Sequence, residues 1–462
     1  MPRVNPDIFR AYDIRGIVDQ DFDPHGVHIL GQACGTYFLQ QGYSSAVVGR
    51  DCRHSSPEYQ QMLVQGLASC GLDVIFLPMT PTPAFYFAVK KLGKNAGVMI
   101  TASHNPPEFN GFKIWCKENT IHSQEIQKVR RIMEKGEFAQ GLGTACQWDP
   151  CPDYLQELSS QGKLDSQLRV VVDGGNGSAG RLCADLLRRI GAQVIELFCE
   201  PDPDFPHHHP DPTLEENLKD LRAEVKRHGA HLGLGLDGDG DRLGVLDEQG
   251  QVIYGDRLLA IYARDLLSRR PGSLILGEVK CSHLLYQDIQ AHGGQAEMYK
   301  TGHSLIKSRM QETGALLAGE MSGHMFFAEG YYGYDDALYA ACRLLQIMDS
   351  APDKPLSSYL QDWPPVISTP EIRMDCPEEL KFTAVDRLLE HFRAQGGQFE
   401  LLDVDGVRLN FSDGWGLVRA SNTQPVLVLR FEAETEDRLQ EIRAFLEHPL
   451  QEIIRSLEGK HA

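Results

Sequence analysis

One pattern of strands and helices occurs three times along this chain and constrains its fold more than any other feature. Each copy opens with a short apolar run that predicts a buried strand, followed by a loop, an apolar-periodic helix and a second strand. More helical sequence then leads to another apolar run that ends in a polar loop. Right-handed crossovers make such strands parallel and place helices on both faces of the sheet. The repeat predicts three tandem, similar α/β domains with mixed, mostly parallel sheets, whose first strands are residues 46–49, 169–172 and 274–277.

The last part of the chain departs from this repeat. From about residue 366 the sequence reads strand, helix, hairpin, strand and helix, with Asp405-Gly406 typical of a hairpin turn. This order predicts a C-terminal α+β domain. Prolines or turn residues interrupt the pattern at 148–152, 247–250 and 363–365. Because 462 residues are too many for one core, we expect four domains, spanning residues 1–149, 150–250, 251–365 and 366–462.

The composition argues against several classes of protein. The formal net charge of −19 disfavours a nucleic-acid partner, because nucleic-acid binding depends on basic surface. No apolar run approaches the roughly 20 residues of a membrane helix, and the N-terminal sequence lacks the apolar core of a signal peptide. The 11 cysteines include no CxxC pair, so neither a disulfide framework nor a zinc ribbon is indicated. We expect a cytoplasmic protein with no nucleic-acid and no membrane partner.

Three polar loops directly follow the last apolar run of each copy. They read Thr-Ala-Ser-His-Asn-Pro, Asp-Gly-Asp-Gly-Asp-Arg and Gly-Glu-Met-Ser-Gly-His. Open α/β sheets bind ligands at the loops that follow the carboxyl ends of their strands. Together these loops can supply a nucleophile, a metal cage and a grip for a polyol, at residues 101–106, 237–242 and 319–324.

The second of these loops predicts a metal site. Asp237, Asp239 and Asp241 project from one tight turn, so three carboxylates can converge on a divalent cation. An EF-hand would need glycine where Arg242 stands, and helices where the flanking sequence is strand-like. A solvated acidic turn is the plainer alternative, but three carboxylates held this closely repel one another without a cation. Mg²⁺ is the metal that phosphate chemistry favours.

Ser103 is the candidate nucleophile, because it lies just past a buried strand and is followed by His104. Alone, this dipeptide is as typical of a turn or a helix N-cap. The sequence around it lacks the GxSxG elbow of α/β-hydrolases. With a metal loop available, phosphorylation of Ser103 is the better interpretation, since a cation can neutralise a transferring phosphoryl group.

Two other motifs compete with this interpretation. Residues 175–180 satisfy the dinucleotide fingerprint GxGxxG after a strand, and Glu196 follows about 20 residues later. A tight strand-to-helix turn explains the same glycines, whereas a dinucleotide site would leave the other loops without a role. His207, His208 and His209 lie between prolines and lack the usual spacing of metal ligands, so an exposed loop is the simpler interpretation.

A fourth loop lies in the tail and reads Arg-Ala-Ser-Asn-Thr-Gln-Pro from Arg419. Its small hydrogen-bonding residues are flanked by Arg419 and Arg430, between two strand-like segments. Guanidinium groups bind phosphate bidentately, and hydroxyl and backbone N–H groups can donate the remaining hydrogen bonds. The loop therefore suits a cluster of phosphate oxygens.

The four loops together resemble the α-D-phosphohexomutase superfamily, and the resemblance runs from Phe9-Arg-Ala-Tyr-Asp-Ile-Arg-Gly16 to the Arg419 loop. The serine loop and the aspartate loop are a highly specific pair. Within the superfamily, the Gly-Glu-Met-Ser-Gly-His loop resembles the bacterial phosphomannomutase/phosphoglucomutase group. Phosphoglucosamine mutases instead carry Gln where Met321 stands. Gln424 departs from the family pattern at a variable-looking position.

This resemblance implies a monomer with four domains in a heart shape around a central cleft. It implies reversible transfer of phosphate between C1 and C6 of mannose and glucose phosphates, through a phosphoserine and a 1,6-bisphosphate intermediate. The implied partners are small hexose phosphates, and the implied cofactors are Mg²⁺ and glucose 1,6-bisphosphate. The sequence does not show which epimer is preferred.

The resemblance also assigns roles to single residues. Ser103 would be the phosphoserine beside His104, and would share the metal with Asp237, Asp239 and Asp241. Glu320 and Ser322 would grip the sugar 3- and 4-hydroxyls. The reacting end would be lined by Arg15, Lys113, Arg242 and His324, with either Lys113 or His324 handling the proton. The non-reacting phosphate would be held by Arg419, Ser421, Asn422, Thr423, Tyr12, Lys280 and His303.

Two other functions fit part of the pattern. A phosphosugar-binding module would keep the Arg419 loop but would not need Ser103 and three metal carboxylates. A phosphatase would release the Ser103 phosphate to water, which four domains around a cleft would exclude. Because a mutase must act on both ends of its sugar, the bisphosphate has to turn over in the site. The segment after residues 363–365 could serve as the hinge that permits this.

Overall fold

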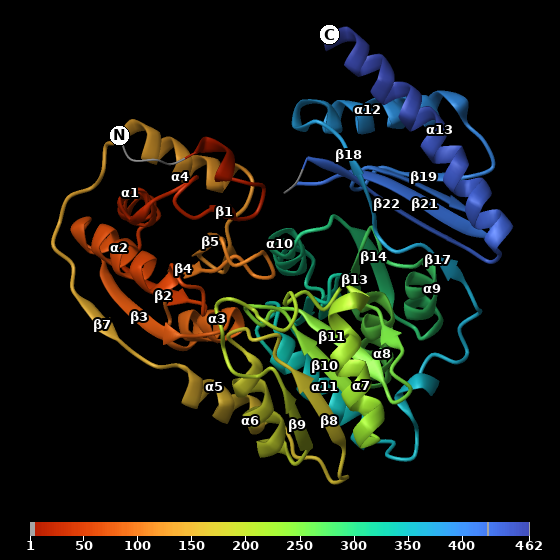
Figure 1. Cartoon of the computed structure of the whole chain (residues 1–462), viewed down its shortest axis with the longest axis horizontal. Coiled ribbons are helices and arrows are strands. Elements are labelled where there is room, and N and C mark those ends of the chain that lie inside the picture. Colours follow the sequence, from red (N-terminus) through yellow and green to blue (C-terminus); the bar gives the residue numbers. More distant parts are fainter. Residues whose placement is uncertain (1–4, 423–424, 462) are drawn as a thin grey trace.

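The computed structural model describes residues 5–422 and 425–461, and the strands of these residues form four sheets in succession along the chain (Figure 1). The first three sheets are mixed and mostly parallel, and the fourth is antiparallel. This confirms the predicted fold class of three similar α/β domains followed by a different C-terminal domain. We number the domains 1 to 4 in chain order.

The sheet of domain 1 has the order β1-β5-β4-β2-β3-β7, and β6 pairs with β5. Strands β4, β2, β3 and β7 run parallel, whereas β5 is antiparallel to both β4 and β1. The strands are β1 (Ile14–Ile17), β2 (Ser45–Arg50), β3 (Asp73–Met79), β4 (Ala96–Ile100), β5 (Phe109–Cys116), β6 (Asn119–Thr120) and β7 (Ala145–Gln147). The helices are η1 (Pro6–Ile8), α1 (Pro24–Gln40), α2 (Ser56–Ser69), α3 (Thr82–Lys91) and α4 (Gln124–Lys135).

Domains 2 and 3 have the sheet orders β12-β11-β10-β8-β9 and β14-β13-β15-β16. The elements of domain 2 are α5 (Cys151–Ser159), β8 (Arg169–Asp173), α6 (Gly180–Ile190), β9 (Gln193–Leu197), η2 (Glu215–Leu218), α7 (Lys219–His228), β10 (Leu232–Leu236), β11 (Leu243–Asp247) and β12 (Val252–Ile253). Those of domain 3 are α8 (Gly255–Arg269), β13 (Leu274–Glu278), α9 (His283–Ala291), β14 (Gln295–Tyr299), α10 (His303–Thr313), β15 (Leu317–Gly319), β16 (Met325–Phe327), α11 (Ala337–Asp349) and η3 (Leu356–Ser358).

The predicted repeat appears as one shared strand order. In each of the three sheets, the strand before a polar loop lies between a parallel and an antiparallel neighbour. These central strands are β4, β10 and β15, with β2, β8 and β13 on the parallel side and β5, β11 and β16 on the antiparallel side. The three polar loops therefore leave equivalent positions of three equivalent sheets.

The sequence of β10 shows how such a strand is fixed. Leu232, Leu234 and Leu236 alternate with glycines, and all five residues are buried. A Cβ on Gly233 would lie 2.7 Å from the side chain of Val225, so the glycine allows α7 to pack directly on the sheet. The strand is thus fully covered, as expected for the centre of a parallel sheet.

Domain 4 is built on the antiparallel order β17-β22-β21-β20-β19, with β18 also paired to β22. The turn at Asp405-Gly406 joins β19 to β20 as predicted, and Gly406 has a φ of 93°. The elements are β17 (Ile367–Ser368), β18 (Ile372–Asp375), α12 (Glu378–Gln395), β19 (Glu400–Leu402), β20 (Val407–Phe411), β21 (Gly414–Ala420), β22 (Val426–Ala433) and α13 (Glu436–His461).

The hydrophobic cores separate domain 4 from the rest. A single buried cluster runs through domains 1, 2 and 3, and includes Phe85, Leu187 and Tyr262. Domain 4 has a core of its own between its sheet and the helices α12 and α13. It meets domain 3 through a small cluster formed by Val279, Trp415 and Leu417. Figure 1 shows domain 4, in blue, at the end of an arc that starts with domain 1.

None of the helices in the described part of the chain combines the length and the apolar character needed to cross a membrane.

Candidate active site

The structure brings the three predicted loops together where β4, β10 and β15 end. Leu243 N donates to Gly323 O over 3.0 Å, which joins the second loop to the third. Arg242 and His324 form an isolated antiparallel bridge beside this bond. A Cβ on Gly238 would lie 2.4 Å from Ser103 O, so only glycine lets the second loop approach the first this closely.

Ser103 lies at the centre of this junction, with 2% of its surface exposed. Its hydroxyl donates to Asp237 Oδ2 over 2.6 Å and lies 3.1 Å from His104 Nδ1. Its φ of 50° is unusual for a residue with a side chain, and its N–H donates to Thr101 Oγ1 over 2.9 Å. The nucleophile predicted in domain 1 is therefore held against the metal loop of domain 2.

Asp237, Asp239 and Asp241 each offer an oxygen within 4.8 Å of the others, and all three are fully buried. Asp237 Oδ1 accepts hydrogen bonds from the backbone N–H groups of residues 240, 241 and 242, which fixes that carboxylate. Asp239 Oδ1 is buried without a hydrogen-bond partner. Three hard oxygens, one of them unsatisfied, match the donor set of a divalent cation.

Lys113 reaches this cage from β5, the antiparallel neighbour of β4. Its ammonium lies 2.8 Å from Asp239 Oδ2 and 2.5 Å from Asp241 Oδ2. Burial opposes its charge, but the two carboxylates outweigh burial and raise the pKa of Lys113 above its usual range. Burial together with the negative charges of Asp241 and Asp239 holds the pKa of Asp237 well above its usual value. The cage thus needs more positive charge than Lys113 supplies.

His324 joins the metal loop to the third loop. Its Nε2 lies 3.1 Å from Asp241 Oδ1, and its Nδ1 lies 2.8 Å from Glu320 Oε2. Burial opposes the imidazolium, but Asp241 and the hydrogen bonds to both carboxylates raise the pKa of His324 to about 9. The imidazole thus links a carboxylate of the metal loop to a carboxylate of the third loop.

His104 has the opposite electrostatic environment. Burial, followed by the positive charges of Arg242 and Arg15, holds the pKa of His104 well below its usual value. Arg15 donates to Asn105 Oδ1 over 2.7 Å and pairs with Asp13. A neutral imidazole thus lies beside the serine hydroxyl, and two guanidinium groups lie close enough to the imidazole to oppose its charge.

The predicted sugar-binding residues, Glu320 and Ser322, lie around His324. Glu320 Oε1 accepts from Gly302 N over 2.7 Å, while its second oxygen faces His324. Ser322 Oγ lies 3.0 Å from His324 Nδ1. Both side chains therefore lie within hydrogen-bonding distance of His324.

The predicted phosphate site draws on three domains. Tyr12 of domain 1 hydrogen-bonds to Asn422 of domain 4, and its ring lies 6.1 Å from that of His303 in domain 3. Arg419 pairs with Asp405 over 2.9 Å and is 4% exposed, and one of its buried nitrogens has no hydrogen-bond partner among the residues that the structure describes. Ser421 is also buried. The predicted residue Thr423 lies outside the described residues.

Domain 4 also holds the segment of domain 3 that carries Lys280. Arg408 donates to Val279 O and to Cys281 O, and Arg430 donates to Lys280 O. Three successive carbonyls are thus bound by two guanidinium groups of the antiparallel sheet. The Lys280 ammonium lies 3.1 Å from Glu371 and 3.5 Å from Glu278.

Sequence reasoning missed three buried charged residues of this region. Glu278 accepts from Met321 N over 3.1 Å and so ties β13 to the third loop. Asp335 pairs with Lys307 over 2.8 Å and lies 3.4 Å from His303 Nδ1. The sequence could have indicated Glu278, because it directly follows the apolar run Leu-Ile-Leu-Gly at the end of a strand. Nothing in the sequence links Asp335 to Lys307.

The glycine-rich motif and the histidine run both make contacts within domain 2. Residues 175–180 form the turn between β8 and α6, and Ser178 N donates to Gly238 O over 2.9 Å, so this turn supports the metal loop. His208 pairs with Asp173 over 3.0 Å, and His207 stacks on Phe198 with ring centroids 3.8 Å apart.

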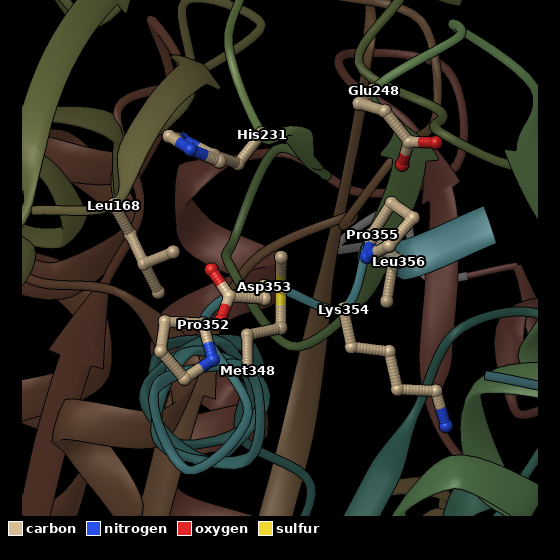
Figure 2. A pocket seen from close by; sticks show the side chains of 9 residues that line it. All are labelled: Leu168, His231, Glu248, Met348, Pro352, Asp353, Lys354, Pro355 and Leu356. Atoms are coloured by element: carbon tan, nitrogen blue, oxygen red, sulfur yellow. The ribbon is translucent and has the colours of Figure 1, made fainter. Parts of the chain in front are cut away.

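A surface pocket lies apart from these loops and contains none of the predicted site residues (Figure 2). It combines side chains of domain 2 with the segment that follows α11. Its lining residues are Leu168, His231, Glu248, Met348, Pro352, Asp353, Lys354, Pro355 and Leu356.

Comparison with known proteins covers the whole chain. Four models of the phosphoglucomutase/phosphomannomutase family match in order. They are alpha/beta/alpha domain I at residues 6–140, domain II at 152–250, domain III at 254–366 and the C-terminal domain at 371–448.

Individual proteins agree with these models. A phosphomannomutase/phosphoglucomutase of Pseudomonas aeruginosa is 46% identical over 99% of this chain and 98% of its own length. A crystal structure of a phosphoglucomutase/phosphomannomutase family protein from Burkholderia thailandensis has a TM-score of 0.91 at 39% identity, covering 97% of this chain and 98% of that one. An N-acetylphosphoglucosamine mutase of Aspergillus fumigatus, solved with GlcNAc-6P and magnesium, shares the fold at 13% identity, with a TM-score of 0.55 over 80% of this chain and 92% of that one.

Proposed function

Because the chain belongs to the phosphoglucomutase/phosphomannomutase family of the α-D-phosphohexomutase superfamily, it interconverts hexose 1-phosphates and hexose 6-phosphates, and we propose that it does so through a phosphorylated Ser103 and a hexose 1,6-bisphosphate intermediate. The observation that carries this proposal is the 2.6 Å hydrogen bond from the Ser103 hydroxyl to Asp237. It supports the proposal because the buried Ser103 hydroxyl then lies against a cage of three carboxylates.

We propose that Asp237, Asp239 and Asp241 hold Mg²⁺ together with an oxygen on Ser103. The unsatisfied oxygen of Asp239 and the raised pKa of Asp237 both support a cation at this point. Bound Mg²⁺ supplies charge neutralisation for a transferring phosphoryl group. Magnesium is also present in the Aspergillus relative of the same fold.

The transfer itself exchanges one phosphate ester for another. The bond between Ser103 Oγ and phosphorus breaks while a bond between a sugar oxygen and phosphorus forms. The sugar hydroxyl loses its proton to a base, and the serine oxygen regains a proton. Returning phosphate from the other end of the bisphosphate to Ser103 reverses each change and regenerates the phosphorylated enzyme.

Of the two candidates for proton transfer, His324 fits better than Lys113. The imidazole of His324 lies between Asp241 of the cage and Glu320, which we assign to the sugar hydroxyls, whereas the Lys113 ammonium contacts the two cage carboxylates Asp239 and Asp241. We therefore assign proton transfer to His324. Lys113, Arg15 and Arg242 then provide positive charge at the reacting end, and His104 lies beside the serine that would carry the phosphate.

The rest of the site serves binding. Glu320 and Ser322 would bind the sugar hydroxyls at C3 and C4. The non-reacting phosphate would be bound by guanidinium, hydroxyl, amide and ammonium groups drawn from domains 1, 3 and 4, namely Arg419, Ser421, Asn422, Thr423, Tyr12, Lys280 and His303. Convergence of Tyr12, His303 and Asn422 supports this assignment.

Because one serine serves both ends of the sugar, the bisphosphate must turn over between the two transfers. We propose that domain 4, which has its own core, opens about the segment after residue 365 to allow this. The domain boundaries at 149, 250 and 365, the monomeric state and the cytoplasmic location stay predictions.

The direct test is incubation with glucose 1-phosphate, Mg²⁺ and a trace of glucose 1,6-bisphosphate. We expect glucose 6-phosphate to form, with a phosphoserine at position 103 in the active enzyme. Release of inorganic phosphate in place of the isomer would indicate a phosphatase. Sugar-phosphate binding without either product would indicate a binding module.

A further inference from the structure

Arg53 lies in the loop between β2 and α2 and is 1% exposed. Its guanidinium donates to four backbone carbonyls, all within the segment that carries Ser103. Nη1 donates over 2.6 Å and 3.0 Å and Nη2 over 2.9 Å and 2.5 Å, and the acceptors are the carbonyl oxygens of Pro106, Phe109, Ser103 and Asn105. One buried side chain thus binds four carbonyls between Ser103 and Phe109, the first residue of β5.

The strand order explains why this residue reaches the loop. Strand β2 is the parallel neighbour of β4, so the loops that follow them leave the sheet side by side. Asp51 forms an ion pair with Arg53 Nε over 3.2 Å and also accepts the backbone N–H of Arg53 over 3.0 Å. Ser56 donates to the same carboxylate over 2.6 Å. Asp51 thus contacts both the charge and the backbone of Arg53.

Domain 2 closes over this arginine. The ring of Phe205 lies 5.3 Å from the Arg53 guanidinium carbon, and Phe205 is itself buried. Phe205 has a φ of 47°, an uncommon conformation for a residue with a side chain. Next to it, Asp204 pairs with His54 over 2.8 Å. The contact couples the serine loop of domain 1 to the domain that supplies the metal ligands.

We propose that Arg53 is a positioning residue for the phosphoryl transfer, which it aids by holding the serine loop so that Ser103 faces the metal cage. This inference rests on the proposed role of Ser103 as phosphoryl carrier. Ser103 keeps its φ of 50° only if its surroundings impose it, and Arg53 binds its carbonyl oxygen directly. The planar guanidinium offers five donors in a fixed fork, whereas a lysine ammonium offers three on a flexible stem. Lysine cannot replace it here.

The test compares Arg53→Lys with the matched control Arg50→Lys, since Arg50 makes a single 3.2 Å hydrogen bond to Asp51 O and none to the serine loop. Each enzyme is phosphorylated with glucose 1,6-bisphosphate, and the phosphoserine content is measured by intact-mass spectrometry. Single-turnover transfer to glucose 6-phosphate is then measured per phosphorylated molecule, so misfolded protein does not enter the rate. The dissociation constant for glucose 1-phosphate is measured in parallel.

For Arg53→Lys we expect transfer to slow by roughly 100-fold, the usual cost of a small misplacement of reacting groups, with sugar-phosphate binding unchanged. The control Arg50→Lys should match the parent enzyme in both the transfer rate and the dissociation constant. Normal transfer in Arg53→Lys, or an equal loss of transfer and binding, overturns the role of Arg53. A parent enzyme that turns over without ever carrying phosphate on Ser103 overturns the proposed function, whatever the Arg53 variants do.

Discussion

The hydroxyl of Ser103 and the carboxylate of Asp237 share a 2.6 Å hydrogen bond although 134 residues separate them. One belongs to domain 1 and the other to domain 2, and both domains share a continuous hydrophobic core. The geometry of the serine and the metal cage is therefore set by the packing of two domains that share one core.

Replacing Ser103 by alanine should reduce turnover by several orders of magnitude, because alanine has no hydroxyl to carry the phosphate. Binding of glucose 1-phosphate should persist, since the phosphate site of domain 4 is intact. Steady-state kinetics, calorimetric binding and intact-mass spectrometry check these outcomes together. Near-normal turnover, or active parent enzyme without phosphoserine, contradicts the assignment.

Removal of divalent metal should abolish turnover, and added Mg²⁺ should restore it. Asp239→Asn removes one charge from the cage and should raise the Mg²⁺ concentration needed for half-maximal activity. Asp185→Asn changes an exposed aspartate on α6 of the same domain and serves as the control. Activity that survives thorough chelation would show that the three carboxylates have no metal to hold.

Glucose and mannose phosphates should be used with comparable efficiency. The two sugars differ only at C2, whereas Glu320 and Ser322 are assigned to the hydroxyls at C3 and C4. The measurement is kcat/KM for both 1-phosphates under the same conditions. A preference above about a hundredfold, or roughly 2.7 kcal/mol at the transition state, would reveal an unrecognised group that reads C2.

Arg419→Ala should weaken the binding of hexose 1-phosphates and 6-phosphates alike, because the same loop must accept the phosphate from either end of the sugar. Dissociation constants for both isomers test this, and an effect on only one isomer contradicts a shared phosphate site.

Cross-linking domain 4 to domain 1 should slow the overall reaction and lead to release or trapping of the 1,6-bisphosphate. Product analysis under single-turnover conditions, with the reduced cross-linker as control, measures this. Normal turnover of the cross-linked enzyme would show that opening of domain 4 is not needed.

Asp336 should make stability fall as the pH rises from about 4 to about 6. It caps α11, and Tyr154 and Tyr331 donate to it, yet burial outweighs these bonds and raises its pKa to about 6. The folded state therefore holds this proton more tightly than the unfolded state, whose carboxyl titrates near 3.9, so protonation stabilises the fold below that range. Relative to Asp336→Asn, the parent should lose on the order of 3 kcal/mol across this interval. Urea unfolding at several pH values measures the difference, and a difference that does not change with pH contradicts the prediction.

The sequence was sufficient for the repeated sheets and for the loops that carry chemistry, because apolar strands and the polar residues after them are local patterns. The family resemblance assigns Lys113 to the reacting end, but the sequence does not show that Lys113 contacts the aspartates. Its partners in the cage lie 126 and 128 residues away. Lys307 and Asp335 escaped notice for the same reason. Arg53 could not be identified because its partners are backbone carbonyls, which every residue has, so no residue type in the loop points to the contact.

The shared strand order of domains 1 to 3 has a consequence for how such enzymes can diverge. Each domain presents one loop from an equivalent edge, and each loop supplies a different chemical part. The serine and the three aspartates lie in the first two domains, while His324 and most of the groups assigned to the sugar and its distant phosphate lie in the last two. Substitutions in the groups assigned to the distant phosphate can therefore change substrate binding without touching the serine or the aspartates, so selection can act on the two sets separately.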